Sequence, residues 1–310
     1  MDRRDFIKIC CCAGIAGIAG FTFFSKRASI NDIEPVPKLK GHDDILSYLE
    51  VSVVDFCNLN CRYCSHFSSI ADKISYDVAL FEQNLDHLSK SGLKNIDTIK
   101  LVGGEPLLHP QINDFVVISR KYFPKSKIFI ITNAVLVNSM DEKFWKTLAD
   151  NNIYLQFSIY DIKIQWHEIL SKIKKYKIQS NISDKIVKNI DEYILRYFCN
   201  FNLDLTGSQE DFKRCEHCIT NCTILQDGKI YKCPLISNVK YFNKKFKQNI
   251  EVSQNDYREV SKIKNPKEFL NWLNQPPAFC KYCGEPYWVK WETSNKHLIS
   301  EWASCKSDKT

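Results

Sequence analysis

The sequence predicts an α/β protein in which a partial barrel of parallel strands is followed by a smaller cysteine-rich region. Short β-rich runs alternate with segments of helical periodicity from Tyr48 to Leu205, which is typical of parallel strands covered by helices. Beyond Leu205 this alternation stops, and Cys, Lys, Asn and aromatic residues become frequent. The length of 310 residues exceeds what most single cores hold and favours two domains, here residues 45–205 and 206–310.

Composition narrows the class of protein. The chain is 44% hydrophobic and 13% aromatic, which excludes a disordered chain, and its ten Gly and ten Pro exclude a collagen-like one. The 43 basic and 36 acidic residues are scattered and give a net charge of +7. This pattern is typical of a solvated surface, so we expect no nucleic-acid partner.

Residues 1–27 resemble a twin-arginine export signal or a membrane anchor. Two arginines at positions 3 and 4 precede an apolar run from Ile9 to Phe24, although Asp5 stands where such signals usually have Ser or Thr. The run is short for a membrane span. A tail that packs on the protein and a segment with no targeting role are the alternatives, and residues 28–44 are predicted to be a linker.

Periodicity places the elements of the core. Strands are expected at 49–56, 96–102, 128–132 and 152–160, and helices at 78–88, 112–122 and 142–149. The last strand has an apolar face (Ile153, Leu155, Phe157 and Ile159) and a polar face (Tyr154, Gln156, Ser158 and Tyr160). Because helices cover a parallel sheet, we expect the polar face to point into a lumen or cleft that binds a ligand.

Three thiols, Cys57, Cys61 and Cys64, follow directly after the first predicted strand. A loop with this spacing can wrap three corners of a cubic 4Fe–4S cluster, and the lack of a nearby fourth cysteine leaves one iron open to an exogenous ligand. A structural zinc site needs four protein ligands, which leave no coordination position open. His66 would supply the fourth, but zinc does not account for the strand immediately upstream. A disulfide between two of the three cysteines would leave the third thiol unpaired.

This segment resembles the radical S-adenosylmethionine (SAM) enzymes, whose signature is this cysteine triplet with an aromatic residue, here Tyr63, before its last member. The family's glycine-rich turn follows at the end of the second predicted strand, as Gly103, Gly104, Glu105 and Pro106. The resemblance implies that backbone groups of this turn reach the methionine amino group of SAM, because residues without Cβ allow a close approach. It also implies a partial (βα)6-type radical SAM barrel.

Two further positions match the family. Thr132-Asn133-Ala134 is similar to the family's Thr-Asn-Gly near the SAM ribose, with Ala in place of Gly, and Ser158 matches a position that can bind the SAM carboxylate. The resemblance implies that SAM chelates the open iron and that an electron from a low-potential donor, such as flavodoxin or ferredoxin, breaks a carbon–sulfur bond. The resulting 5′-deoxyadenosyl radical then removes hydrogen from a substrate.

The C-terminal cysteines predict a second site in which every position is ligated. Cys222 and Cys233 flank a predicted hairpin with an Asp-Gly turn, and Cys280 and Cys283 form a later pair. The pattern is similar to the auxiliary 4Fe–4S module of the SPASM and twitch subfamilies, and the one-cluster twitch version fits better. Zinc is the alternative, because four thiolates hold it well.

Several residues of the C-terminal region have no settled role. One of Cys215 and Cys218 can replace Cys222, or the pair can stay free, or it can ligate a second auxiliary site, which Cys305 can join. A helix is expected at 266–273. His66 and His109 are the two histidines beside motif residues. A group of aromatic residues near the end of the sequence is expected to cover the auxiliary cluster or the entrance to the substrate site. It consists of Tyr287, Trp288, Trp291 and Trp302.

We therefore expect a radical SAM oxidoreductase or tailoring enzyme that removes hydrogen from a small molecule, with the auxiliary cluster accepting an electron. The alternatives are a peptide or protein maturase of the SPASM type and an iron–sulfur redox protein that does not cleave SAM. The chemistry favours the cytoplasm or the cytosolic face of the inner membrane, with membrane association through the N-terminus, whereas the N-terminal signal favours export.

Overall fold

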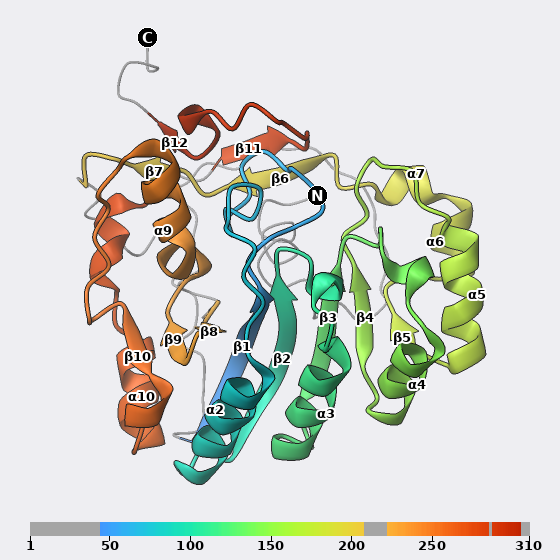
Figure 1. The fold of residues 1–310 in the computed structure, drawn as a ribbon, viewed down its shortest axis with the longest axis horizontal. Coiled ribbons are helices and arrows are strands. Elements are labelled where there is room, and N and C mark those ends of the chain that lie inside the picture. The colour runs from blue at the N-terminus through green and yellow to red at the C-terminus, as the bar shows by residue number, and fades with distance from the viewer. Residues whose placement is uncertain (1–43, 208–221, 285–286, 305–310) are drawn as a thin grey trace, which may run out of the picture.

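The computed structural model describes residues 44–207, 222–284 and 287–304. Its centre is an eight-stranded sheet with the strand order β10-β9-β8-β1-β2-β3-β4-β5 (Figure 1). The fold is α/β with a mostly parallel sheet, as the sequence predicts. The strands are β1 (Ile45–Val54), β2 (Asn95–Gly103), β3 (Lys127–Thr132), β4 (Tyr154–Phe157), β5 (Gln179–Ser180), β8 (Ile224–Gln226), β9 (Lys229–Tyr231) and β10 (Tyr257–Glu259).

Strands β1 to β5 are parallel. Figure 1 shows helices α2 to α5 alongside these strands. Leu49, Val51 and Val53 of β1 belong to the large apolar cluster between sheet and helices, so the alternate residues of β1 face the opposite side. The helices of this part are α2 (Val78–Lys90), α3 (Ile112–Tyr122), α4 (Glu142–Asp150), α5 (Trp166–Tyr176), α6 (Asp184–Lys188) and α7 (Ile190–Tyr193), with 3-10 helices η2 (Pro106–Leu108) and η3 (Val137–Ser139).

Side-chain caps explain where two of these helices begin. The Asp77 carboxylate accepts the Leu80 N–H at 2.7 Å before α2, and that of Asp141 accepts the Phe144 N–H at 2.8 Å before α4. Helix α3 has the predicted bounds. Strand β4 is shorter than the predicted 152–160, because only Tyr154 to Phe157 pair with β3. Before it, Asn152 has a positive φ of 48°, which does not fit a strand.

The C-terminal region joins the same sheet. β8 pairs with β1 in parallel, and the predicted hairpin of β8 and β9 is confirmed. Its turn residues Asp227 and Gly228 have positive φ values of 49° and 71°, as a two-residue hairpin turn requires. Helix α10 (Pro266–Leu273) has the predicted bounds. The sheet therefore continues beyond residue 205, through β8, β9 and β10. The remaining helices are α9 (Pro234–Phe246), η5 (Val260–Lys262), η6 (Ala278–Tyr282) and η7 (Ile299–Glu301).

A second apolar cluster involves α9. The sequence indicated no large apolar core in the C-terminal region, but α9 packs with residues from the preceding part of the chain. The cluster includes Phe67, Leu203, Leu235, Phe242 and Trp302. Two small sheets lie at the upper edge of Figure 1, toward the carboxyl ends of the parallel strands: β6 (Tyr197–Asn200) with β11 (Tyr287–Lys290), and β7 (Leu203–Asp204) with β12 (Ala303–Ser304).

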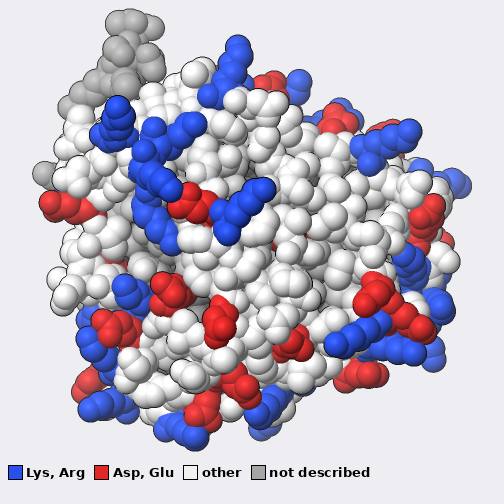
Figure 2. All heavy atoms as spheres, viewed as in Figure 1, with Lys and Arg blue, Asp and Glu red and all other residues white. Residues whose placement is uncertain are grey.

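Acidic and basic side chains are interspersed on the face shown in Figure 2. Within residues 44–207, 222–284 and 287–304, no helix has the length and apolar character needed to cross a membrane. The predicted signal or anchor at 1–27 lies outside these residues, as do Cys215, Cys218 and Cys305.

Candidate active site

Three thiols from one loop lie together after the carboxyl end of β1. Cys57, Cys61 and Cys64 are unpaired and partly exposed. Burial is the largest cause that raises the pKa of Cys57 to about 12; the Leu59 N–H opposes this shift, and the neighbouring Cys64, Glu105 and Cys61 contribute to it. Burial and the neighbouring Cys64 likewise raise the pKa of Cys61 to about 12. The three sulfurs therefore lie near enough to influence one another, as a shared ligand site requires.

Hydrogen-bond donors point at two of these sulfurs. The Leu59 N–H donates to Cys57 Sγ at 3.4 Å, and Asn133 Nδ2 donates to the same sulfur at 3.6 Å. The indole Nε1 of Trp291 donates to Cys61 Sγ at 3.3 Å. Donors of this kind stabilise the negative charge of cysteine sulfurs that ligate a metal centre.

The arrangement fits a cluster better than a single metal ion. In the described part of the chain, no three or more His, Cys, Asp or Glu side chains are arranged to hold one ion. Thiolates on a zinc ion all lie about 2.3 Å from one centre. Cysteines of an iron–sulfur cluster bind different iron atoms and therefore stand farther apart. Three neighbouring thiols that are not arranged around one ion match this second case.

The turn after β2 packs against the start of the cysteine loop. A Cβ at Gly103, whose φ is +145°, would lie 2.1 Å from the Val54 carbonyl oxygen. A Cβ at Gly104 would lie 2.0 Å from the Phe56 carbonyl oxygen, which also accepts the Glu105 N–H at 3.1 Å. These two glycines are therefore required for contact between the two loops, in addition to any approach to SAM.

The Glu105 side chain is fully buried between the ends of β2 and β3. Its carboxylate accepts from Thr132 Oγ1 at 2.7 Å, the Asn133 N–H at 2.8 Å and the Leu107 N–H at 3.2 Å. Burial raises its pKa to about 7, although these hydrogen bonds oppose the shift. Pro106 begins η2 directly after it. The carboxylate thus holds the residues at the carboxyl end of β3 in place. Because it is occupied by these contacts, the turn can bind a ligand only through its backbone.

Asn133 connects the end of β3 to the cysteine loop. Its Nδ2 donates to Asn58 Oδ1 at 2.7 Å as well as to Cys57. The next residue, Ala134, has a φ of +70° and is buried. The backbone here adopts the left-handed conformation that the family's glycine favours, and Ala134 adopts it at a cost of about 1–2 kcal/mol.

Two aromatic residues border the thiols. The pKa of Tyr160 is raised well above its usual value, first by burial and then by the nearby Cys61, Cys64 and Cys57. Tyr160 stacks on Trp291, with ring centroids 4.8 Å apart. Ser158 is half-buried at the carboxyl end of β4, where its N–H donates to the Thr132 carbonyl at 2.9 Å.

Tyr63 lies within the cysteine loop itself. It has a φ of +61°, and the Arg62 guanidinium lies over its ring at 4.9 Å. Its ring centroid is 6.3 Å from that of Phe198 in β6. Tyr63 therefore links the loop to the small sheet that includes β11.

The last described segment, 287–304, lies on the cysteine loop. Cys61 and Thr293 form an antiparallel bridge, and the Arg62 N–H donates to the Glu292 carbonyl at 2.9 Å. Trp302 Nε1 donates to the main-chain carbonyl of Cys64 at 3.0 Å. The late aromatic group was expected to cover an auxiliary cluster or a substrate mouth. Two of its members, Trp291 and Trp302, contact the first cysteine group, and Trp288 packs with Cys222. The covering role stays a prediction.

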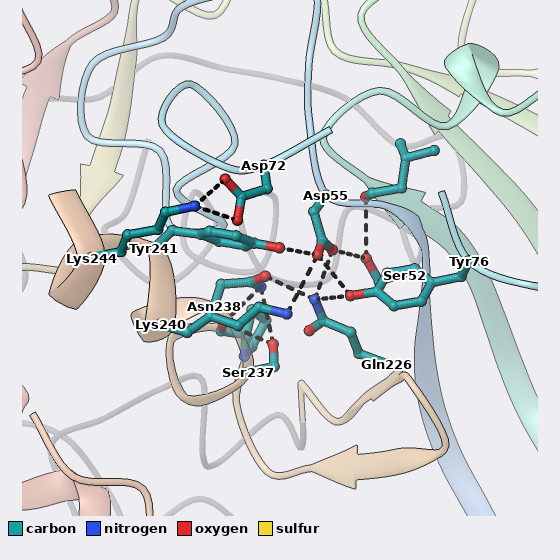
Figure 3. A network of polar contacts seen from close by, with 12 residues as sticks. Ser52, Asp55, Asp72, Tyr76, Gln226, Ser237, Asn238, Lys240, Tyr241 and Lys244 are labelled. Atoms are coloured by element: carbon teal, nitrogen blue, oxygen red, sulfur yellow. Dashed lines mark hydrogen bonds and ion pairs between the residues drawn. The ribbon is translucent and has the colours of Figure 1, made fainter. Parts of the chain in front are cut away.

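A buried carboxylate anchors the base of the same loop (Figure 3). Asp55 is 2% exposed and comes immediately before the loop. Its Oδ2 accepts from the Tyr76 hydroxyl at 2.7 Å and from the Tyr241 hydroxyl of α9. Its Oδ1 accepts from Gln226 Nε2 of β8 at 2.7 Å, and Lys240 Nζ lies 3.6 Å from Oδ2. Residues of the C-terminal region thus fix the start of the cysteine loop.

The four C-terminal cysteines occupy two kinds of position. Cys222 and Cys233 flank the β8–β9 hairpin and are buried. Cys233 belongs to the second apolar cluster and Cys283 packs against it. Cys222 packs with Phe201 and Trp288. Cys280 lies in η6. The hairpin part of the predicted auxiliary site is present, and the convergence of all four thiols stays a prediction.

The two histidines beside motif residues differ in their surroundings. His109 Nδ1 accepts the Gln111 N–H at 3.0 Å, so its Nε2 carries the proton and donates to the Tyr76 carbonyl at 2.9 Å. Burial lowers its pKa. His66 Nε2 lies 3.7 Å from Glu50 Oε2, on the side of the sheet away from the helices. His109 is therefore structural, whereas His66 lies on the side of the sheet away from the helices, beside Glu50.

Comparison with known proteins gives the family. Residues 51–205 match the model of the Radical SAM superfamily, and the chain belongs to this superfamily. Members bind a 4Fe–4S cluster and SAM, so the chain is a radical SAM enzyme.

Similar proteins have several different names. A GTP 3′,8-cyclase of Clostridium botulinum (strain Hall) is 25% identical over 252 residues, which cover 79% of this chain and 78% of that one. A GTP 3′,8-cyclase of Sulfurovum sp. is 28% identical over 155 residues, covering 50% and 44%. Among solved structures, BtrN in complex with AdoMet and 2-DOIA has a TM-score of 0.47 at 20% identity, covering 78% of this chain and 94% of that one.

Proposed function

We propose that the chain removes a hydrogen atom from a polar small molecule by radical SAM chemistry. The observation that carries this proposal is the convergence of Cys57, Cys61 and Cys64 beside the glycine turn and Asn133 at the carboxyl edge of the sheet. When bound, the cluster and SAM would supply the 5′-deoxyadenosyl radical. The protein would position the reactants and exclude water.

The residues of the site would divide this work. The three cysteines would hold the cluster, while the backbone of Gly103 to Pro106, together with Asn133, would bind the methionine and ribose parts of SAM. Ser158 would meet the SAM carboxylate. Tyr63 would pack beside the site within the loop. Glu105 would act on SAM only through the backbone that it orients.

The side of the sheet opposite the helices supports a polar substrate. Lys100, Glu50 and Gln156 lie there on β2, β1 and β4 and are 4%, 8% and 7% exposed. The Lys100 ammonium lies 5.0 Å over the Tyr48 ring. Gln156 Oε1 accepts no hydrogen bond from the described residues. Buried polar atoms without partners are costly, so a ligand that supplies them is favoured.

Charge complementarity suggests two contacts for such a substrate. Burial raises the pKa of Glu50, but His66, Tyr48 and Lys100 outweigh this effect and lower it overall, so Glu50 is ionised at neutral pH. Its carboxylate would accept from a substrate hydroxyl or amine. The Lys100 ammonium would bind an anionic group of the substrate.

We further propose an auxiliary 4Fe–4S cluster on Cys222, Cys233, Cys280 and Cys283. The supporting observation is the β8–β9 hairpin with one thiol at each open end. A cluster ligated at every iron would accept an electron from the substrate radical and complete a two-electron oxidation. Iron and sulfide quantitation on wild type and on a Cys222→Ala, Cys233→Ala variant tests this: about four fewer irons per chain are expected, by the composition of a 4Fe–4S cluster.

The proposed enzyme needs a low-potential electron donor, such as flavodoxin or ferredoxin. Such donors and SAM are cytosolic, so we propose that it works in the cytoplasm or at the cytosolic face of the membrane, to which the segment Ile9 to Phe24 would attach it. Fractionation of a tagged full chain, in comparison with a chain lacking residues 1–27, distinguishes this location from export.

A direct test is anaerobic incubation of the reconstituted enzyme with SAM, dithionite and a panel of deuterated polar substrates. Transfer of deuterium into 5′-deoxyadenosine would support hydrogen abstraction from that substrate. GTP belongs in the panel because relatives similar over most of this chain are named GTP 3′,8-cyclase. Conversion of GTP to a cyclised product would support that second candidate function, and transfer from a peptide alone would support a maturase.

The role of Lys100 has a matched control. Lys100→Met should raise the KM for an anionic substrate about tenfold or more while SAM cleavage without substrate persists, because one charge-assisted contact is lost. Lys90→Met removes an exposed lysine of α2 that pairs only with Asp86 among the described residues. It should leave both quantities unchanged. Equal effects of the two variants would contradict the assignment.

A further inference from the structure

Trp291 is held against the sulfur of a cysteine that the proposed function assigns to the cluster. Its Nε1 donates to Cys61 Sγ at 3.3 Å, and the residue is 8% exposed. One ring face stacks on Tyr160 at a centroid distance of 4.8 Å and an interplanar angle of 15°. The donor is therefore both buried and fixed in direction.

The backbone around Trp291 fixes the donor as well. The Trp291 N–H donates to the Arg196 carbonyl at 2.8 Å. The following residue, Glu292, forms an ion pair with Arg62 at 2.9 Å, and Thr293 forms the bridge with Cys61. The indole thus approaches the sulfur from a segment whose backbone is held by Arg196 at Trp291 and by the cysteine loop at the next two residues.

We propose that Trp291 tunes the reduction potential of the cluster held by Cys57, Cys61 and Cys64. This inference rests on the proposed function in one respect, namely that these three cysteines are the ligands. Hydrogen bonds to ligating sulfurs are one of the factors that set the potential of an iron–sulfur cluster. One-electron reduction adds negative charge to the cluster and its sulfurs, so an N–H donor stabilises the reduced form and raises the potential. Trp291 is accordingly a positioning residue that makes the cluster easier for its electron donor to reduce.

Trp302 provides a matched control in the same segment. It is also buried, and its Nε1 also donates to the cysteine loop, but to the main-chain carbonyl of Cys64 and not to a sulfur. If indole packing alone matters, both tryptophans should behave alike. If donation to sulfur matters, only Trp291 should affect the potential.

The test is an anaerobic redox titration of the reconstituted full chain. It is monitored by the EPR signal of the reduced cluster on Cys57, Cys61 and Cys64, here called the N-terminal cluster. Trp291→Phe keeps an aromatic ring against Tyr160 and removes the N–H. At a fixed applied potential its ratio of reduced to oxidised cluster should fall about three- to tenfold, and tenfold corresponds to about 59 mV for one electron. Trp302→Phe should leave the midpoint potential unchanged. An unchanged potential in Trp291→Phe, or equal shifts in the two variants, would overturn the proposal.

A second measurement covers the case in which Trp291→Phe does not fold. In wild-type protein labelled with indole-15N tryptophan, pulsed EPR should detect a hyperfine coupling between the reduced cluster and one indole N–H, and its absence would contradict the proposal. Failure of the ligand assignment is recognised separately. A Cys57→Ala, Cys61→Ala, Cys64→Ala variant that keeps the N-terminal cluster signal would refute that assignment, whatever the tryptophan variants show.

Discussion

The cysteine loop at residues 57–64 and the segment at 287–304 lie against each other, yet only the first has a recognisable local pattern. The loop has its three cysteines at close spacing directly after a strand, and the chemistry follows from that spacing. The later segment has scattered aromatic and charged residues. Its contacts with Cys61, Arg62 and Cys64 span more than 220 residues of sequence. The comparison shows that the ligands of the site are encoded locally, whereas its environment is built by distant parts of the chain.

If distant residues support the loop, loss of the Asp55 network should have the largest effect on stability. Asp55→Ala leaves the Tyr76 and Tyr241 hydroxyls without their buried acceptor and removes one acceptor of Gln226, so it should lower the free energy of unfolding by about 4 kcal/mol. Urea unfolding of the apoprotein measures this change.

Asp72 is the matched control, because its carboxylate pairs with Lys244 at an exposed position, at 2.6 Å. Asp72→Ala should cost no more than about 1 kcal/mol. Similar losses in the two variants would mean that burial of the Asp55 network contributes little to holding the loop.

The contact between the glycine turn and the loop predicts the next largest effect. Gly104→Ala places a Cβ 2.0 Å from the Phe56 carbonyl oxygen and should destabilise the protein by about 3 kcal/mol, with weaker SAM binding. Gly228→Ala has no heavy atom nearer than 4.0 Å to the new Cβ, so only its φ of +71° matters, at about 1–2 kcal/mol. Thermal unfolding and SAM titration of both variants measure the difference, and a greater loss in Gly228→Ala would count against the packing role.

Glu105 predicts a pH dependence of the apoprotein. Its pKa is raised from 4.5 to about 7 by burial, so between these values the folded protein binds more protons than the unfolded chain. Stability from this group is therefore present at the acidic end of the window and is lost as the pH rises through 7, on the order of 2–3 kcal/mol. Glu105→Gln should reduce the dependence of the free energy of unfolding on pH, measured by urea unfolding between pH 4.5 and 7.5. An unaltered dependence would refute the assignment of this effect to Glu105.

Ala134 predicts the smallest effect. Ala134→Gly relieves a φ of +70° but adds freedom to the unfolded chain, so the net change should be a stabilisation of no more than about 1 kcal/mol. Ala149→Gly in α4 has no such strain to relieve and should destabilise by up to about 1 kcal/mol. Opposite signs in thermal unfolding are expected, and destabilisation by both would show that Ala134 is not strained.

Much of the parallel sheet could be predicted from the sequence, because each strand and helix has its own periodicity. Helix α3 has its predicted bounds, and the faces of β4 follow the predicted alternation, with Leu155 and Phe157 in the main apolar cluster. Because Cys57 follows β1 and Gly104 follows the parallel strand β2, the two residues could be placed at the same edge of the sheet, where the structure has them.

The partners from the C-terminal region could not be predicted. Neither the parallel pairing of β8 with β1 nor the position of Trp291 has a local signal. Two weak signals were present: an acidic residue, Asp55, directly before a cysteine loop, and several tryptophans near the chain end. Asp55 and Trp291 acquire their partners only through tertiary packing, which one sequence does not specify.

The most direct test of the account is Mössbauer and EPR spectroscopy of the reconstituted full chain, with and without SAM, beside the Cys57→Ala, Cys61→Ala, Cys64→Ala variant. We expect a 4Fe–4S signal that changes when SAM is added and that is missing from the variant. A signal that persists in the variant, or one that SAM leaves unaltered, would contradict the assignment of these thiols to a cluster with an open iron.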